Sequence, residues 1–181
     1  MNLFDPALTA VICVAAGAIF VTGAVSKWRE RELFAAAMEN YDLIPRVAVP
    51  SASVLLLATE FAIGVLLLLP VLRPWPQLAG VGLLLLVTAA VAVNLLRGRS
   101  SISCGCGGAS GDQTLSWALV ARNLGFAGLL AIAAIATSAR PLVWLDYLFI
   151  CIGGLLGAGL YAAASQLIAN QPRLTALRDG T

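Results

Sequence analysis

The chain has 181 residues, of which 60% are hydrophobic and only 11% are charged, with a formal net charge of +2. So little charge cannot cover the surface of a water-soluble domain, and the composition therefore excludes an ordinary soluble globular protein. The absence of histidine removes the most frequent nitrogen ligand of metals and the usual general base at neutral pH. The basic residues lie beside apolar runs, as they do in membrane proteins, so we expect no nucleic-acid partner.

Five apolar runs follow one another along the chain, each near the roughly 20 residues that cross a bilayer. They cover residues 8–25, 50–69, 78–96, 117–137 and 146–168. Because an open strand edge is not stable in lipid, all five are predicted to be helices. The sequence therefore predicts an all-α integral membrane protein, a bundle of about five transmembrane helices. We expect one domain, residues 1–170, in contact with membrane lipid, and a polar C-terminal tail, residues 171–181.

The connections between the runs carry helix breakers and most of the charge. Residues 26–46 combine charged and aromatic side chains at roughly helical spacing, which predicts a short helix at the membrane interface. Residues 97–112 form a Gly- and Ser-rich loop that contains the sequence CGCGG at 104–108. No Lys or Arg precedes the first run, so we expect a retained span rather than a cleaved signal peptide.

The Lys and Arg residues divide unevenly between the two sides that these spans define. With the N-terminus outside, nine of the eleven lie on the cytoplasmic side, and only Arg73 and Arg140 lie outside. Short cytoplasmic loops are enriched in Lys and Arg. We therefore expect the N-terminus outside, and the C-terminus and the CGCGG loop in the cytoplasm.

Cys104 and Cys106, separated only by Gly105, are the candidate catalytic residues. A disulfide across so short a spacing strains the backbone, and strained, exposed disulfides exchange readily with thiols. Gly105 relieves part of that strain because it has no Cβ. Two alternatives stay open. One is a metal held by thiolates of two chains, although we expect no metal site, and the other is a Gly-rich loop with incidental cysteines.

Cys13 and Cys151 form a possible second thiol pair. Each lies about five residues inside the outer end of its span, so at 1.5 Å per residue both are roughly 8 Å deep in the same leaflet. The alternative is that both are ordinary buried apolar residues. Because the CGCGG loop is at the opposite face, direct exchange between the two pairs would need a partner or a large motion.

Three polar residues inside the spans are further candidates. Glu60 lies near the middle of the second span, where a carboxylate must be protonated, paired or facing a cavity. Arg122 and Asn94 are its candidate partners. Arg122 and Asn123 open the fourth span, and Arg122 either extends toward the interface, pairs with Glu60 or holds the CGCGG loop.

A set of short motifs occurs in a fixed order along residues 8–165. They are Ala24-Val25-Ser26-Lys27, Tyr41-Asp42-Leu43-Ile44-Pro45, Glu60, CGCGG, Leu115-Ser116-Trp117 and Arg122-Asn123. In this order they resemble the MauE family of methylamine-utilisation membrane proteins, within the wider DoxX-like redox-associated group. One departure is visible, because that family's pattern usually reads CGCFG and Gly107 stands here at the aromatic position.

The resemblance implies a DoxX-like bundle of five helices in the bacterial cytoplasmic membrane. It also implies a role in maturing an exported enzyme, such as the disulfide-rich small subunit of methylamine dehydrogenase, alongside a thioredoxin-like, MauD-like partner. Carried over to this chain, Cys104 and Cys106 are the thiol pair. The residues of the polar framework are Lys27, Glu60, Arg122 and Asn123.

We therefore expect a membrane protein that handles thiol–disulfide equivalents for maturation of an exported client. One alternative is a non-enzymatic anchor or assembly subunit, in which the cysteines are dispensable. Another is a quinone-linked redox subunit with Glu60 and Arg122 near the quinone head; otherwise we expect no cofactor. Transport is favoured less, because only Glu60 lies deep in the membrane.

Overall fold

The computed structural model describes residues 5–105, 114–135 and 140–179, and it contains five helices that are long and apolar enough to cross a membrane. These are α1 (Pro6–Arg29), α3 (Val49–Leu67), α4 (Trp75–Leu96), α5 (Trp117–Ile135) and α6 (Trp144–Asp179). A short helix, α2 (Arg31–Asn40), follows α1, and two 3₁₀ turns, η1 (Arg46–Ala48) and η2 (Pro70–Leu72), precede α3 and α4. The all-helical fold class and the five membrane helices predicted from the sequence are confirmed.

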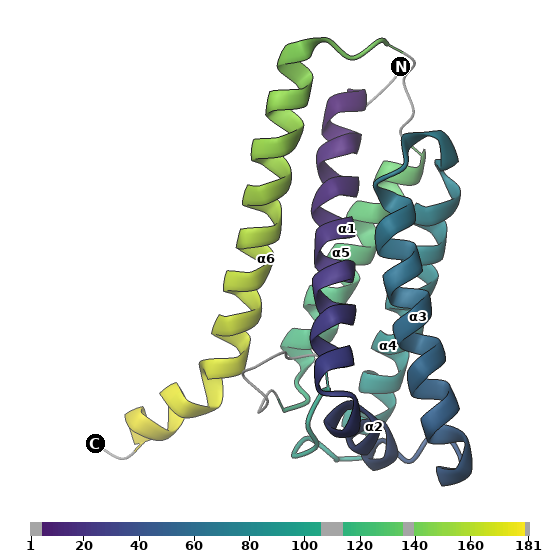
Figure 1. The fold of residues 1–181 in the computed structure, drawn as a ribbon. Helices are drawn as coiled ribbons and strands as arrows, with labels where there is room; N and C mark the ends of the chain where they lie inside the picture. Colours follow the sequence, from purple (N-terminus) through teal and green to yellow (C-terminus); the bar gives the residue numbers. More distant parts are fainter. Residues whose placement is uncertain (1–4, 106–113, 136–139, 180–181) are drawn as a thin grey trace.

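The helix boundaries have local causes. Asp5 caps α1 by accepting a hydrogen bond of 2.8 Å from the backbone of Ala7, and Pro6 takes the first helical position, where no N–H is needed. The charged residues after 25 still belong to α1, which ends at Arg29. At the other end of the chain α6 continues past the predicted span to Asp179, and Figure 1 shows it bending near the C-terminus. Pro172, which lies in this part of the helix, is a residue type that kinks helices.

Four of the membrane helices form the bundle, and α6 lies along its outside. The most extensive packing is between α4 and α5, α1 and α6, and α1 and α3. Figure 1 shows α2 lying across one end of the bundle, near the end of α1. We call this the Cys104 end, because Cys104 follows α4 there, and the opposite end, with η2 and the start of α6, the Arg140 end.

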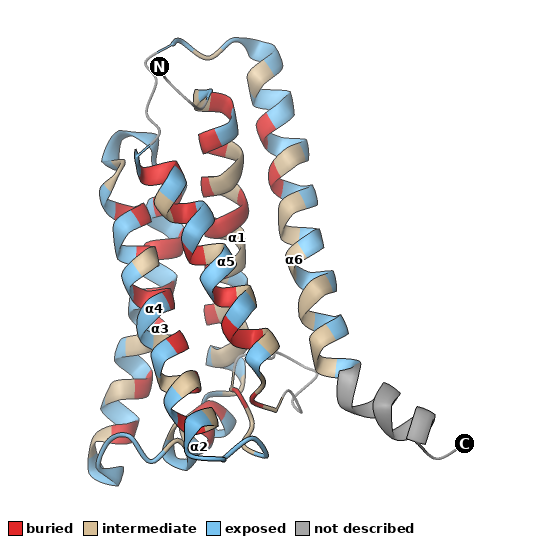
Figure 2. Cartoon of the chain, turned by 180° about the vertical axis from the view of Figure 1, so that it is seen from behind, coloured by how far each residue is buried: buried red, intermediate tan, exposed pale blue. Residues whose placement is uncertain are grey.

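The core of the bundle lies among α1, α3, α4 and α5, where Figure 2 places most of the buried residues. Its members, which include Phe20, Leu67 and Leu130, bring these four helices together. A second cluster beneath the loop contains Val91, Cys104 and Leu119. Most of α6 is exposed or half-buried in Figure 2.

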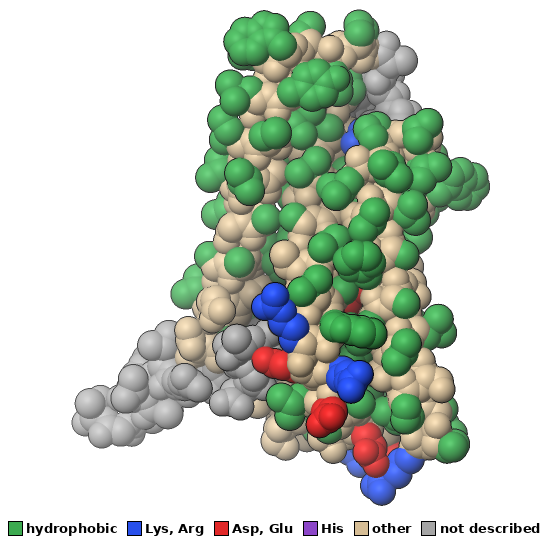
Figure 3. Space-filling view, viewed as in Figure 1, with side chains coloured by type: hydrophobic (Ala, Val, Ile, Leu, Met, Phe, Trp, Pro, Cys, Tyr) green, Lys and Arg blue, Asp and Glu red, His purple; other side chains and the backbone are tan. Residues whose placement is uncertain are grey.

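The outer surface shows the division expected of a protein in lipid. In Figure 3 hydrophobic side chains cover the visible face over the lengths of the helices, and most of the charged side chains visible on this face gather near α2 at the Cys104 end. Lipid can contact the apolar zone without displacing water from charged groups. The chain is therefore a multi-pass membrane protein whose interfacial helix α2 lies at its charged end.

Candidate functional site

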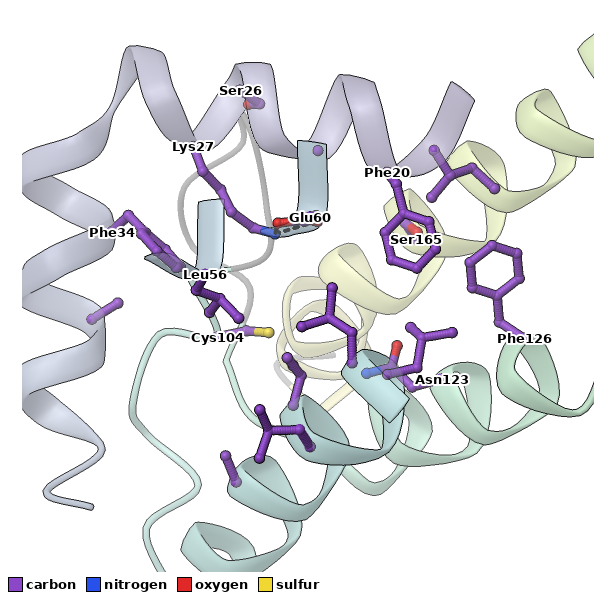
Figure 4. Close-up of a pocket in the computed structure, with 18 of the residues that line it drawn as sticks. Phe20, Ser26, Lys27, Phe34, Leu56, Glu60, Cys104, Asn123, Phe126 and Ser165 are labelled. Carbon is purple, nitrogen blue, oxygen red and sulfur yellow. Dashed lines mark hydrogen bonds and ion pairs between the residues drawn. The ribbon is translucent and has the colours of Figure 1, made fainter. Parts of the chain in front are cut away.

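A pocket of about 790 Å³ extends from the Cys104 end into the bundle. Side chains of all five membrane helices and of α2 line it, most of them apolar. The polar framework named from the sequence, Lys27, Glu60, Arg122 and Asn123, lines this one pocket together with Cys104. Figure 4 shows the Cys104 sulfur pointing into the space that these side chains surround. Residues that are distant in the sequence thus form a single site.

Lys27 and Glu60 form an ion pair across the α1–α3 interface (Figure 4). The Lys27 ammonium donates to both carboxylate oxygens, at 2.7 Å to Oε1 and 2.5 Å to Oε2, and the two side chains are only 15% and 12% exposed. The partners expected for Glu60 were Arg122 and Asn94, and this expectation is wrong. Lys27 reaches Glu60 because the last turn of α1 packs beside α3, and a paired carboxylate is tolerated inside a membrane protein.

The lysine of this pair also contacts α2. Its ammonium lies 5.8 Å from the centre of the Phe34 ring, a distance at which the ring face attracts a cation. Phe34 is buried and sits on the face of α2 that turns toward the pocket (Figure 4). The interfacial helix is therefore part of the pocket wall.

Cys104 is held at the pocket by a hydrogen bond from Tyr41 and by the conformation of Gly105. The Tyr41 hydroxyl donates to the Cys104 carbonyl at 3.1 Å, and burial raises the pKa of Tyr41 to about 12, so this donor stays protonated at physiological pH. Gly105 has φ of +65°, and a Cβ there would lie 3.1 Å from the Ala37 side chain and 3.4 Å from Phe34. Glycine is therefore required by both conformation and space. Cys104 is 6% exposed and is disulfide-bonded.

The ends of the loop that carries Cys104 are fixed to the bundle. Ser103 and Thr114 form an isolated antiparallel bridge, and Leu115 donates from its backbone to Ile102 at 3.1 Å. Arg99 pairs with Asp42 at 3.6 Å, which ties the loop to the turn after α2. Cys106 and Gly107 lie outside the described residues, so the proposed partner of Cys104 stays a prediction from the sequence.

Arg122 and Asn123 form the opposite wall of the pocket. The Arg122 guanidinium donates to Asn123 Oδ1 at 3.0 Å and to Ser165 Oγ at 2.9 Å, and it lies 5.0 Å from the centre of the Tyr161 ring. From the sequence, Arg122 was expected to extend toward the interface, to pair with Glu60 or to hold the CGCGG loop. Its contacts match none of these roles fully, because the side chain joins α5 to α6. Arg122 is therefore a cation in the pocket that has no carboxylate partner among the described residues.

Cys13 and Cys151 are both free thiols in the structure. Cys13 is fully buried, whereas Cys151 is exposed on α6. Their helices pack against each other, but the two thiols are not joined.

Sequence reasoning missed the contribution of α6 to the site. Tyr161 and Ser165 are one helical turn apart, contact Arg122 and line the pocket, and the Tyr161 ring lies 5.3 Å from that of Phe126. Spacing of four residues places both on one face. A polar pair of this kind, next to small residues in an otherwise apolar span, is the signal that could have identified this face.

Comparison with known proteins shows to which family the chain belongs. A family model described as "Methylamine utilisation protein MauE" matches residues 5–136. The chain belongs to the MauE family. Methylamine utilization protein MauE of Paracoccus denitrificans is 33% identical over 166 residues, which cover 91% of this chain and 89% of the relative. The MauE protein of Paracoccus versutus is 36% identical over 151 residues, covering 83% and 81%.

A third MauE relative, from Methylorubrum extorquens, is 34% identical over 143 residues, or 77% of each chain. No solved structure matches the chain. The segment that the MauE family model matches contains Lys27, Glu60, Cys104 and Arg122, but it ends before α6. The α6 wall of the pocket therefore lies beyond the part of the chain that the family model describes.

Proposed function

We propose that this MauE-family protein transfers thiol–disulfide equivalents through Cys104 and Cys106 and thereby supports the maturation of an exported, disulfide-containing protein of methylamine utilisation. The observation that carries the proposal is the position of Cys104, whose sulfur points into a pocket between the Lys27–Glu60 pair and Arg122 (Figure 4). Structural cysteines are usually inert in apolar surroundings, whereas reactive ones lie near cations.

In the proposed exchange a thiolate of the reduced partner protein attacks the Cys104–Cys106 disulfide and forms a mixed disulfide. The second thiolate of the partner then attacks the partner's sulfur in this mixed disulfide, which releases the partner with a new disulfide and leaves Cys104 and Cys106 as two thiols. Lys27 and Arg122 favour the thiolate over the thiol by their positive charge. The proposed partner is a thioredoxin-like, MauD-like protein, and the proposed client is the small subunit of methylamine dehydrogenase.

The orientation proposed from the Lys and Arg distribution places the Cys104 end in the cytoplasm and the N-terminus outside the bacterial inner membrane. The exported client would then mature on the other side. In that case reducing equivalents must cross the membrane through another carrier, whereas with the opposite orientation the pair could exchange with the exported proteins directly.

Replacement of either cysteine tests the proposal. In a host that depends on this chain, we expect Cys104→Ser and Cys106→Ser to abolish disulfide formation in the client, measured by alkylation of its free thiols. Cys151→Ser, which removes an exposed free thiol, is the matched control and should change nothing. Normal client maturation in both active-pair variants would instead favour a non-enzymatic assembly subunit.

The partner is identified by trapping. When one cysteine of the pair is replaced by serine, the remaining thiol can attack the disulfide of an oxidised partner and hold the partner covalently, because no second cysteine is present to close the pair and release it. We expect one of the two single-serine variants to accumulate a reducible adduct with a thioredoxin-like protein, seen on a non-reducing gel. An adduct in neither variant would argue against exchange through this pair.

A further inference from the structure

The pocket has two chemically different parts. Toward the middle of the membrane it is lined by apolar side chains such as Phe20, Leu83 and Phe126, and toward the Cys104 end by Lys27, Glu60 and Arg122. Its volume of about 790 Å³ is in the range of sites that hold small organic molecules. A molecule that fits both parts has a polar head and an apolar chain.

The pocket opens toward lipid. Leu55 of α3 and Leu86 of α4 both line the pocket, yet they are 68% and 65% exposed, so they stand at its mouth on the apolar surface. Packing between α3 and α4 is much less extensive than between α4 and α5. A molecule dissolved in the bilayer can therefore reach the pocket between α3 and α4.

The polar part carries donors and an excess of positive charge. Lys27 and Arg122 are the cations, and Glu60 is the single carboxylate among the described residues that line the pocket. The Lys27 ammonium and the Arg122 guanidinium can donate hydrogen bonds to carbonyl oxygens of a bound molecule. Their positive charge stabilises the negative charge that develops on those oxygens during reduction. A phospholipid would also fill the apolar part, but its phosphate group cannot accept electrons from the neighbouring Cys104 sulfur.

We propose that the pocket binds a lipid-soluble isoprenoid quinone, with its head between Lys27 and Arg122, and that this quinone accepts electrons from Cys104 and Cys106. This inference rests on the proposed thiol–disulfide function. Two thiols lose two electrons and two protons as one S–S bond forms, and both carbonyl groups of the quinone become hydroxyl groups. The quinol then leaves into the bilayer by the same opening.

The test uses the purified full chain in lipid nanodiscs, reduced with dithiothreitol and freed of reductant. On anaerobic mixing with decylubiquinone, we expect one quinol to form and two thiols to disappear per chain, followed by ultraviolet absorbance and thiol titration. In parallel, oxidation of the same pair by glutathione disulfide measures thiol exchange without a quinone.

Two variants address the pocket itself. Arg122→Gln removes one charged donor and should slow quinone reduction about tenfold, while Arg140→Gln at the opposite end is the control. Ala158→Phe places a ring in the pocket and should block the quinone, whereas Gly159→Phe, whose neighbouring space is open, should not. Oxidation by glutathione disulfide should stay normal in Ala158→Phe, Gly159→Phe and Arg140→Gln, which also shows that these three variants fold. In Arg122→Gln, which also removes a charge that favours the thiolate, quinone reduction should slow more than oxidation by glutathione disulfide does.

The outcomes separate the two proposals. If glutathione disulfide oxidises the pair but decylubiquinone does not, or if the pocket variants reduce quinone at the normal rate, the quinone site is wrong and the exchange function stands. If neither oxidant closes the disulfide, the proposed function itself fails. Extraction of bound lipids by mass spectrometry should find isoprenoid quinone; a preparation that retains only phospholipid and does not reduce quinone identifies a lipid site.

Discussion

Lys27 and Glu60 bring opposite charges to the same depth of the pocket, and each is the other's ion-pair partner among the described residues. Removal of one partner leaves the other charge largely shielded from water without a counterion, which is far more costly than loss of an exposed pair. The pair therefore contributes to stability mainly by preventing an unpaired charge.

Glu60→Gln should accordingly lower the free energy of unfolding by about 3 kcal/mol, measured by thermal or denaturant unfolding in detergent micelles. Glu39→Gln is the matched control. It breaks the exposed Arg46–Glu39 pair, whose side chains are 88% and 43% exposed, and should cost no more than about 0.5 kcal/mol. Equal effects of the two substitutions would contradict the role assigned to the buried pair. The double variant with Lys27→Met and Glu60→Leu should recover most of the loss, because no charge remains unpaired.

Tyr41 gives a prediction about alkaline pH. Its pKa rises from 10.0 to about 12 in the folded chain because of burial, so between these values the folded state holds a proton that the unfolded state has lost. Stability from this group is complete below pH 10 and is lost as pH rises toward about 12. We expect the unfolding midpoint to fall over this interval, and to fall less steeply in Tyr41→Phe. Tyr147→Phe, which changes an exposed tyrosine, should keep the steeper decline.

At this scale the sequence predicted the members of the site but not their contacts. Lys27, Glu60, Arg122, Asn123 and Cys104 were all named, and all line one pocket. The partner of Glu60 was not predictable, because α1 and α3 are apolar on nearly every face, and periodicity then gives no indication of which face meets which helix.

Close approach of α1 and α3 fixes the distance across which Lys27 reaches Glu60. A Cβ at Gly17 would lie 2.8 Å from the Gly64 carbonyl oxygen and 2.9 Å from the Leu68 side chain. The first of these atoms is backbone, so the contact is not relieved by a side-chain rotation. Small residues are the usual means of such approach between membrane helices.

Gly17→Ala should therefore force the two helices apart and destabilise the protein by about 1–3 kcal/mol. Gly82→Ala on α4 is the control, since nothing lies within 4 Å of a Cβ built there, and its higher helix propensity should leave stability unchanged or slightly increased. Unfolding in detergent compares them. A Gly17→Ala chain as stable as the Gly82→Ala chain would show that α1 and α3 are not in direct backbone contact.

The membrane helices could be predicted as elements because roughly 20 apolar residues in a row have few alternatives in lipid. The contribution of α6 to the pocket could not, since it depends on α6 lying close enough to α5 for Arg122 to reach Ser165. No local pattern in either helix encodes that distance.

Over the whole molecule, the two ends of the bundle differ in charge. The Arg140 end carries few basic side chains, with Arg140 bridging Asp5 at 2.8 Å and Asp146 at 2.7 Å. The hydrogen bonds from Arg140 lower the pKa of Asp5. Most of the other Lys and Arg residues lie toward the opposite end, which the positive-inside rule assigns to the cytoplasm.

Labelling of single cysteines in intact cells tests this orientation. In a chain whose four cysteines are replaced, we expect Val71→Cys in η2, where Val71 is 87% exposed, to react with a membrane-impermeant maleimide. Glu32→Cys on the exposed side of α2 should react only after the cells are permeabilised. The reverse pattern would place the Cys104 end outside.

The helix α6 is packed against α1 more closely near the Arg140 end than toward the C-terminus. Near the Arg140 end it lies directly on α1, where a Cβ at Gly154 would come within 2.7 Å of Val14, and Arg140 joins the starts of both helices. Figure 1 shows α6 leaning away from α1 farther along, where Tyr161 and Ser165 complete the pocket wall. A protein that pulled on the C-terminal segment would tilt α6 about its anchored end and widen the cavity beside Arg122. Binding of a protein to the C-terminal segment would in this way change the pocket around the Cys104 sulfur, while α1, α3, α4 and α5 kept their positions.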